Sequence, residues 1–205
     1  MTRVKICGLT NLEDALAACR LGADALGFVL AQSPRRVSPD AVRAIIRALP
    51  PLVSTVGVFA DAEPEEVAWL RRYCGLDWVQ LHGQEDEAAA AGLGPRVIKA
   101  LKVGPGREPD AEAYPGCALL LDTHDPRAAG GTGKSFDWSL ARPVARARPV
   151  ILAGGLNPDN VARAIEQVQP FAVDVSSGVE IRKGKKDHER IAKFIARVKT
   201  ARAPA

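Results

Sequence analysis

The sequence predicts an α/β protein that closes into a single (β/α)8 barrel, and three observations lead to that prediction. Short apolar runs alternate with longer amphipathic runs along the whole chain, which is typical of parallel strands joined by helical crossovers. Eight such units divide the 205 residues into lengths of about 26, enough for a compact barrel. The first apolar run ends in CGLTN and not in a glycine-rich nucleotide-binding turn, which disfavours a doubly wound open sheet. We therefore expect one domain over residues 1–205.

Eight short runs rich in aliphatic residues predict the strands. They cover 3–7, 24–30, 53–59, 77–82, 96–102, 117–122, 149–153 and 171–176. The amphipathic patterns between them predict helices over 11–21, 39–48, 63–74, 84–91, 137–146, 157–168 and 187–200, with a poorer and shorter one near 108–114. Asn11, Ser38 and Asn157 begin three of these helices with side chains that cap helix N-termini, and a proline follows the last two.

The composition excludes several classes of protein. Hydrophobic residues make up 47% of the chain, which excludes a disordered protein. No uncharged apolar run reaches the roughly 18 residues of a membrane helix, and the start MTRVKICG lacks the pattern of a signal peptide. Four cysteines without a CxxC pair and three scattered histidines predict neither a disulfide framework nor a metal site. We expect a cytoplasmic protein that needs no membrane.

The net charge of +4 comes from the C-terminal end of the chain. The segment 182–202 contains nine basic and two acidic residues, so the rest of the chain is slightly acidic. A basic stripe can bind nucleic acid, but only Phe194 interrupts this one with an aromatic ring, which leaves no platform for stacked bases. We expect a solvated terminal helix and no nucleic-acid partner.

Strand alternation predicts which side chains point into the barrel, because successive residues of a strand face opposite sides. Val4 and Ile6 are expected to face the helices, so that Arg3, Lys5 and Cys7 face the interior. Four further polar residues are expected to point inward or to end their strands, namely Gln80, His82, Asp122 and Asp174. The first and eighth strands become neighbours when a barrel closes, so Lys5 and Asp174 are expected to pair.

Cys7 and Asp122 end their strands at the face where barrel enzymes build active sites. A nearby cation lowers the pKa of a thiol, so Lys5 is expected to favour the thiolate of Cys7. Such a thiol can act as a nucleophile or a base, and Asp122 as an acid or a base. One thiol and one carboxyl suit proton transfer on a sugar phosphate. The alternative is a structural role, with a buried cysteine and an interior ion pair.

Two loops after the last strands predict a phosphate site. LAGGLNPDN at 152–160 joins two glycines to a helix start, and DVSSGVE at 174–180 adds two hydroxyls and a glycine. Glycine permits close approach of the backbone, and free N–H groups attract anions. Barrels commonly hold a phosphate in these two loops. The expected contacts are Gly154, Gly155, Ser177 and Gly178.

Two other loops at the same face contain candidate binding motifs. AAGGTGKS at 128–135 imitates a P-loop but has Ala128 where that motif needs glycine, so we reject a nucleotide site there. The long connection that contains it is expected to act as a lid. SPRR at 33–36 offers an arginine whose planar guanidinium suits a carboxylate, although a solvated basic loop is an equal alternative.

Taken together, the motifs resemble the phosphoribosylanthranilate isomerase family of tryptophan biosynthesis, whose members are (β/α)8 barrels. The resemblance extends in order through nearly the whole chain and rests on a very specific combination of motifs. These are KICGLTN (5–11), SPRRVSP (33–39), VGVF (56–59), QLHG (80–83), LLLDT (119–123), GGTGKSFDW (130–138), AGGLNPDNV (153–161) and DVSSGVE (174–180).

The resemblance implies an Amadori rearrangement of N-(5-phosphoribosyl)anthranilate to 1-(2-carboxyphenylamino)-1-deoxyribulose 5-phosphate, without a cofactor or a metal. It implies that Cys7, in KICG, is the general base and that Asp122, in LLLDT, is the general acid. It places the anthranilate carboxylate on Arg35 and the phosphate on backbone groups around Gly154, Gly155, Ser177 and Gly178. Asp174 is expected to contact the substrate or to hold Lys5.

Two alternatives stay open at this point. The first is another phosphate-binding barrel enzyme such as indole-glycerol-phosphate synthase, for which this chain is short. The second is a module without catalytic activity that binds a phosphate ligand or, through the stripe at 182–202, nucleic acid. The expected partner is a small-molecule substrate, and a homodimer is favoured over a monomer only modestly.

Overall fold

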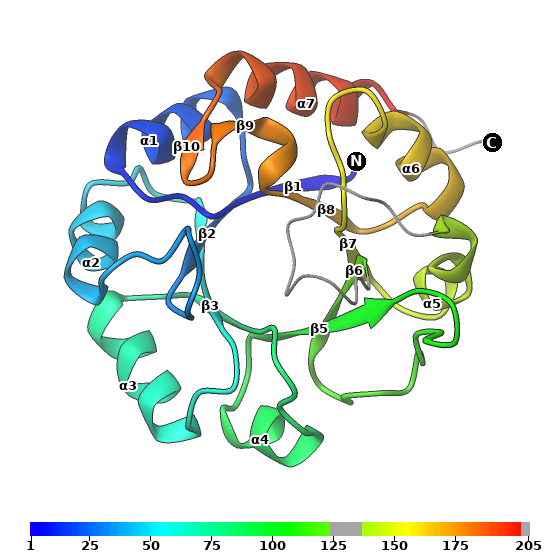
Figure 1. Cartoon of the computed structure of the whole chain (residues 1–205), viewed down its shortest axis with the longest axis horizontal. Helices are drawn as coiled ribbons and strands as arrows, with labels where there is room; N and C mark the ends of the chain where they lie inside the picture. Colours follow the sequence, from blue (N-terminus) through cyan, green and yellow to red (C-terminus); the bar gives the residue numbers. More distant parts are fainter. Residues whose placement is uncertain (124–136, 202–205) are drawn as a thin grey trace.

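Eight parallel strands close into a barrel in the order β1 to β8, with β8 hydrogen-bonded to β1 (Figure 1). This computed structural model describes residues 1–123 and 137–201. The strands are β1 (Arg3–Cys7), β2 (Ala25–Val29), β3 (Ser54–Phe59), β4 (Trp78–Leu81), β5 (Val97–Val103), β6 (Ala118–Thr123), β7 (Val150–Leu152) and β8 (Ala172–Val175). The predicted barrel is therefore confirmed, and each predicted strand lies within one or two residues of an observed one.

Helices form an outer ring around the strands (Figure 1). They are α1 (Leu12–Leu21), α2 (Pro39–Arg47), α3 (Pro64–Cys74), α4 (Glu87–Gly92), α5 (Arg142–Ala147), α6 (Val161–Val168) and α7 (His188–Thr200), with single 3-10 turns η1 (Trp138–Leu140) and η2 (Ser177–Val179). Asn11 and Ser38 cap α1 and α2 as predicted, because their side chains accept the backbone N–H groups of Asp14 and Ala41.

Three predicted helices differ from the structure. The one expected over 137–146 is divided into the turn η1 and the helix α5. The expected short helix near 108–114 is absent, since the connection from β5 to β6 consists of turns and bends. Three prolines and three glycines in 104–116 explain this, because both residue types oppose helix formation. The helix expected from Asn157 begins at Val161 instead, since Asn157 closes a turn by accepting the N–H groups of Asp159 and Asn160.

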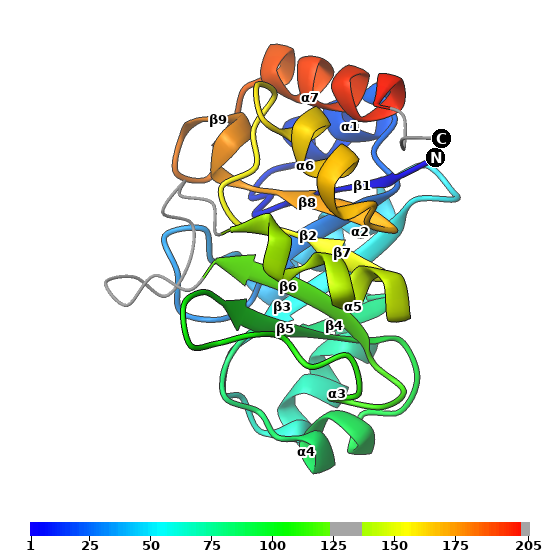
Figure 2. The ribbon, with the colours of Figure 1, turned by 90° about the vertical axis from the view of Figure 1, so that its right-hand side faces the viewer.

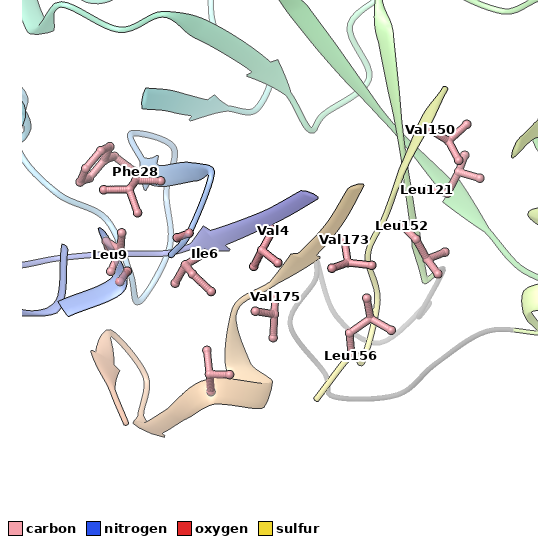
Figure 3. Close-up of a cluster of buried hydrophobic side chains, with 14 of the residues drawn as sticks. Val4, Ile6, Leu9, Phe28, Leu121, Val150, Leu152, Leu156, Val173 and Val175 are labelled. Atoms are coloured by element: carbon pink, nitrogen blue, oxygen red, sulfur yellow. The ribbon is translucent and has the colours of Figure 1, made fainter. Parts of the chain in front are cut away.

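The main hydrophobic core lies between the strands and the helices. Val4 and Ile6 of β1 belong to it, as predicted, and Figure 3 shows them beside Val173 and Val175 of the neighbouring strand β8. Burial of such side chains contributes about 1.5–3 kcal/mol each. The barrel itself encloses a smaller second cluster, made of Val56, Ile98, Ala100, Leu120 and Ala153.

The side chains above this second cluster are polar and form pairs across neighbouring strands. Lys5 and Asp174 are register partners on β1 and β8, and their side chains form the predicted ion pair at 2.9 Å. Lys102 and Asp122 are register partners on β5 and β6 and form a second ion pair at 2.6 Å. The alternation of side chains therefore places an apolar floor below and a charged layer at the mouth of the barrel.

A small hairpin of β9 (Glu180–Arg182) and β10 (Lys185–Lys186) follows β8, which the sequence did not predict. Figure 2 shows it at the left, at the C-terminal ends of the strands, while both chain ends lie on the opposite side. The expectation of a wholly solvated basic helix over 182–202 is wrong for this part. Lys186 is buried against Glu180, and Lys185 pairs with Glu13 and Asp14.

In the described part of the chain, no helix combines the length and the hydropathy needed to cross a bilayer.

Candidate active site

A cavity of about 540 Å³ opens at the C-terminal ends of the strands, the end at the left of Figure 2. It is lined by side chains or backbone of seven of the eight residues predicted for the site, namely Cys7, Arg35, Asp122, Gly154, Gly155, Asp174 and Ser177. The remaining one, Gly178, does not line the cavity and lies close to the backbone oxygen of Leu156. Residues from six different loops and strands thus meet at one site.

Cys7 ends β1 on one side of this cavity. Gly27 on β2 leaves room for it, because a Cβ atom there would lie 2.8 Å from the Cys7 Sγ. Burial raises the pKa of the thiol above its ordinary value, although Lys5 beneath it acts in the opposite direction. Lys5 thus acts toward the thiolate, as expected, but it does not prevail over burial in the resting protein. The effect of burial on the Cys7 pKa outweighs that of the Lys5 charge, in part because Asp174 neutralises Lys5 at a distance of 2.9 Å.

Asp122, the last residue but one of β6, lies on the other side of the cavity, three strands from β1 around the ring. Its Oδ2 accepts a hydrogen bond from Lys102 Nζ at 2.6 Å and lies 3.1 Å from His82 Nε2. Burial by itself would raise the pKa of Asp122, but the hydrogen bond from His82 and the charge of Lys102 outweigh it and hold the pKa at about 2. The resting side chain is a carboxylate.

Arg35 lies against the cavity in the loop after β2. Its Nε and Nη2 donate to the two carboxylate oxygens of Glu180 at 2.8 and 2.7 Å. Glu180 also accepts a hydrogen bond from Lys186 Nζ at 3.0 Å, so its single negative charge is shared between the two cations Arg35 and Lys186. Arg35 keeps Nη1, which makes no hydrogen bond to Glu180, for another acceptor. Its neighbour Arg36 is exposed and does not line the cavity.

The phosphate loops fit closely against one another. Gly154 and Gly155 have φ angles of 81° and 65°, which side chains rarely adopt. A Cβ atom on Gly154 would also collide with Thr123, and one on Gly178 would collide with the backbone oxygen of Leu156. Glycine at 154 and 178 is what permits the loops after β6, β7 and β8 to touch.

Comparison with known proteins identifies the family. The model of N-(5'-phosphoribosyl)anthranilate (PRA) isomerase matches residues 4–197. The curated isomerase of that name from Geobacter sp. strain M21 is 51% identical to the chain, and the alignment covers 97% of this chain and 98% of the relative. The one from Desulforudis audaxviator is 54% identical, and the alignment covers 95% of this chain and 97% of the relative. The crystal structure of phosphoribosyl anthranilate isomerase from Thermotoga maritima superimposes with a TM-score of 0.91 and is 48% identical in sequence. The alignment covers 97% of this chain and 99% of that one. The chain belongs to the PRA isomerase family.

Membership in this family makes the chain an isomerase of the aldose–ketose type. The comparisons do not favour the alternative of indole-glycerol-phosphate synthase. A further solved structure, a phosphoribosyl anthranilate isomerase 47% identical over 97% of this chain and 99% of its own, has a TM-score of 0.87 and contains reduced 1-(o-carboxyphenylamino)-1-deoxyribulose 5-phosphate.

Several residues of this family member escaped the sequence analysis. Lys102 continues the inward alternation of Ile98 and Ala100 on β5, a signal that could have found it. Glu180 and Lys186 gave no such signal, because the β9–β10 hairpin that brings them to Arg35 was not predicted. His82 was expected to point inward and does so, but it contacts Asp122 and not Cys7.

Two further expectations concern the loop at 128–135 and a metal site. The proposed lid and the rejected P-loop at 128–135 lie outside the described residues. In the part of the chain that the structure describes, no group of three or more His, Cys, Asp or Glu side chains is arranged to hold a metal ion.

Proposed function

We propose that Cys7 and Asp122 carry the two proton transfers of the PRA isomerase reaction in tryptophan biosynthesis. Asp122 protonates the ring oxygen of the ribose, which opens the ring to a Schiff base. Cys7 then removes the proton from C2, and the resulting enolamine tautomerises to the ketone. The observation that carries the proposal is the meeting of the Cys7 thiol and the Asp122 carboxyl on the walls of a single cavity.

The two ends of the substrate have complementary groups in the same cavity. The phosphate is bound by backbone N–H groups around Gly154, Gly155, Ser177 and Gly178, and the left-handed conformations of Gly154 and Gly155 allow close approach. Arg35 binds the anthranilate carboxylate through the guanidinium edge that Glu180 leaves open. Asp174 holds Lys5 beneath Cys7 and borders the space for the sugar.

The resting protonation states are the reverse of those that the reaction uses. Asp122 is a carboxylate because its pKa is held at about 2, and Cys7 is a thiol because burial raises its pKa. An active complex therefore needs a proton moved to Asp122 and one removed from Cys7. Substrate binding brings a phosphate and a carboxylate into the cavity and displaces water, which favours the protonated form of Asp122. Cys7 must give its proton to another acceptor before it can act as the base.

Substitution of each group tests the proposal. Cys7→Ala and Asp122→Asn are each expected to lower kcat about 10²–10⁴-fold, the usual contribution of one acid or base. The turnover of phosphoribosylanthranilate is measured by the decay of its fluorescence, and circular dichroism checks the fold. Cys19→Ala, a half-buried cysteine of α1 away from the cavity, is the matched control and is expected to retain activity. Normal turnover by either site variant would remove that residue's role.

We also propose a cytoplasmic homodimer. A solved Thermotoga maritima relative, 47% identical, is described as a dimeric enzyme from which monomers were generated. All four cysteines are free, in keeping with a reducing compartment. Light scattering coupled to size-exclusion chromatography tests the dimer, since a mass near the 21.8 kDa of one chain would exclude it.

A further inference from the structure

Lys183 lies in the turn of the β9–β10 hairpin and lines the active-site cavity. Its neighbour Arg182 is exposed as well but does not line the cavity. In the part of the chain that the structure describes, Lys183 makes no hydrogen bond or ion pair. None of the roles given above uses this cation.

The other two lysine and arginine side chains that line the cavity already have carboxylate partners. Arg35 is paired with Glu180 at 2.7 Å, and Lys102 is paired with Asp122 at 2.6 Å. Among the described residues, Lys183 is therefore the one lining cation whose charge no side chain compensates. A negatively charged ligand can pair with this cation without sharing or breaking an existing ion pair.

The hairpin turn is held against the loop that carries Arg35. Thr10 Oγ1 donates to the backbone oxygen of Gly184 at 2.5 Å, and the backbone N–H of Gly184 donates to Glu180 Oε1 at 3.3 Å. A Cβ atom on Gly184 would lie 3.8 Å from the backbone oxygen of Pro34, so the turn and the loop after β2 lie side by side. Because these contacts fix the backbone of the turn, the position of the Lys183 ammonium depends on its own side chain alone.

We propose that Lys183 is a second cation for the anthranilate carboxylate of the substrate, beside Arg35. This inference rests on the proposed function, which assigns that carboxylate to Arg35. Nη1 of Arg35 makes no hydrogen bond to Glu180 and can donate to a ligand, and so can the ammonium of Lys183. A carboxylate has two oxygens that each accept more than one hydrogen bond, so it can accept from both cations at once. Lys183 contributes to binding of the substrate and takes no part in the proton transfers.

Substitution of Lys183 is expected to change binding and not turnover. Lys183→Ala is expected to raise KM for phosphoribosylanthranilate about three- to fivefold, the effect of one exposed ion pair, with kcat unchanged. Lys183→Arg keeps the charge and is expected to stay within about twofold of the parent. Arg182→Ala removes the adjacent exposed cation outside the cavity and is the matched control, expected to behave as the parent. Equal effects of the two alanine substitutions, or a fall in kcat alone, would overturn the proposal.

A pair of ligands separates the carboxylate from the phosphate. Reduced 1-(2-carboxyphenylamino)-1-deoxyribulose 5-phosphate has both groups, and its 1-phenylamino counterpart has only the phosphate. Isothermal titration calorimetry measures the Kd of each ligand for the parent and for Lys183→Ala. We expect the substitution to weaken binding of the carboxylate ligand about three- to fivefold and to leave that of the phenylamino ligand unchanged. Equal weakening of both would mean that Lys183 acts on the phosphate or through the general field of the cavity, and would overturn the proposal.

The same titrations distinguish failure of this inference from failure of the proposed function. If the parent binds the two ligands equally, the cavity has no carboxylate site, so the role of Arg35 fails and that of Lys183 fails with it. If the parent prefers the carboxylate ligand and Lys183→Ala keeps the full preference, only the inference about Lys183 fails. Circular dichroism checks the fold of the variant, which we expect to be intact because Lys183 has no partner to lose within the described part of the chain.

Discussion

Arg35 and Glu180, 145 residues apart in the sequence, form a two-point ion pair with N–O distances of 2.8 and 2.7 Å. The pair joins the loop after β2 to the hairpin after β8 and closes one side of the cavity. Both side chains are almost completely buried, so each depends on the other for compensation of its charge. The geometry of the expected carboxylate site is therefore set by a residue that the substrate need not touch.

The first prediction concerns this pair. Glu180→Gln leaves the buried cations of Arg35 and Lys186 without their counter-charge, which costs about 3–5 kcal/mol of unfolding free energy for a broken buried pair. We expect KM for phosphoribosylanthranilate to rise more than kcat falls, because Arg35 loses its fixed orientation. Urea unfolding and steady-state kinetics measure the two effects. Glu13→Gln removes a solvent-exposed partner of Lys185 and is the control, with no measurable change expected.

The second prediction concerns Asp14, a fully buried carboxylate that anchors the hairpin to α1. It accepts from the backbone N–H of Lys186, from Asn11 and from Lys185, and it contacts His188. Burial would raise the pKa of Asp14, but these hydrogen bonds outweigh it and lower the pKa to about 2. A lowered carboxyl pKa stabilises the fold fully above the ordinary value of 3.8 and loses this contribution as the pH falls toward 2.

Asp14→Asn is therefore expected to destabilise the protein near neutral pH and to matter less in acid. We expect a loss of roughly 1–2 kcal/mol at pH 7, below what the full shift implies, because partly exposed partners are screened by water. Chemical unfolding of parent and variant at several pH values measures the difference. A difference that stays constant from pH 7 to pH 2.5 would contradict the assigned cause.

Much of this architecture could be predicted because local patterns decide it. The alternation of Val4 and Ile6 with Lys5 and Cys7 fixes which face of β1 meets the helices, and closure of the barrel then brings Lys5 to Asp174. The ends of the strands likewise place Cys7 and Asp122 at one mouth.

The partners of these residues could not be predicted in the same way. Lys186 and Glu180 belong to a short hairpin that has no periodic pattern, and its position depends on Asp14 far away in the chain. The protonation states also depend on the surroundings in three dimensions. Burial of Cys7 outweighs the cation beside it, which no sequence spacing reveals.

The third prediction follows from the contact between the phosphate loops. Gly178→Ala forces a Cβ atom against the backbone oxygen of Leu156 and within 3.0 Å of Asn157, both on the loop after β7. Because a backbone cannot turn aside as a side chain can, we expect a loss of about 1–3 kcal/mol and a raised KM. Thermal unfolding and kinetics measure both. Gly92→Ala at the end of α4, where nothing lies within 4 Å of the added atom, is expected to be neutral or slightly stabilising. Equal effects of the two substitutions would contradict the steric argument.

The fourth prediction concerns the reactivity of Cys7. The residue is 8% exposed, and burial raises the pKa of its thiol, so little thiolate is present at pH 7. We expect iodoacetamide to modify Cys7 slowly at pH 7 and much faster above pH 9, with the rate followed by fragmentation mass spectrometry that distinguishes Cys7 from Cys19. Lys5→Met removes the cation that opposes the effect of burial, so the rate at each pH should fall further. Rapid modification of the parent at pH 6 would instead mean that Lys5 prevails over burial, and the resting site would then hold a base ready for C2 before the substrate arrives.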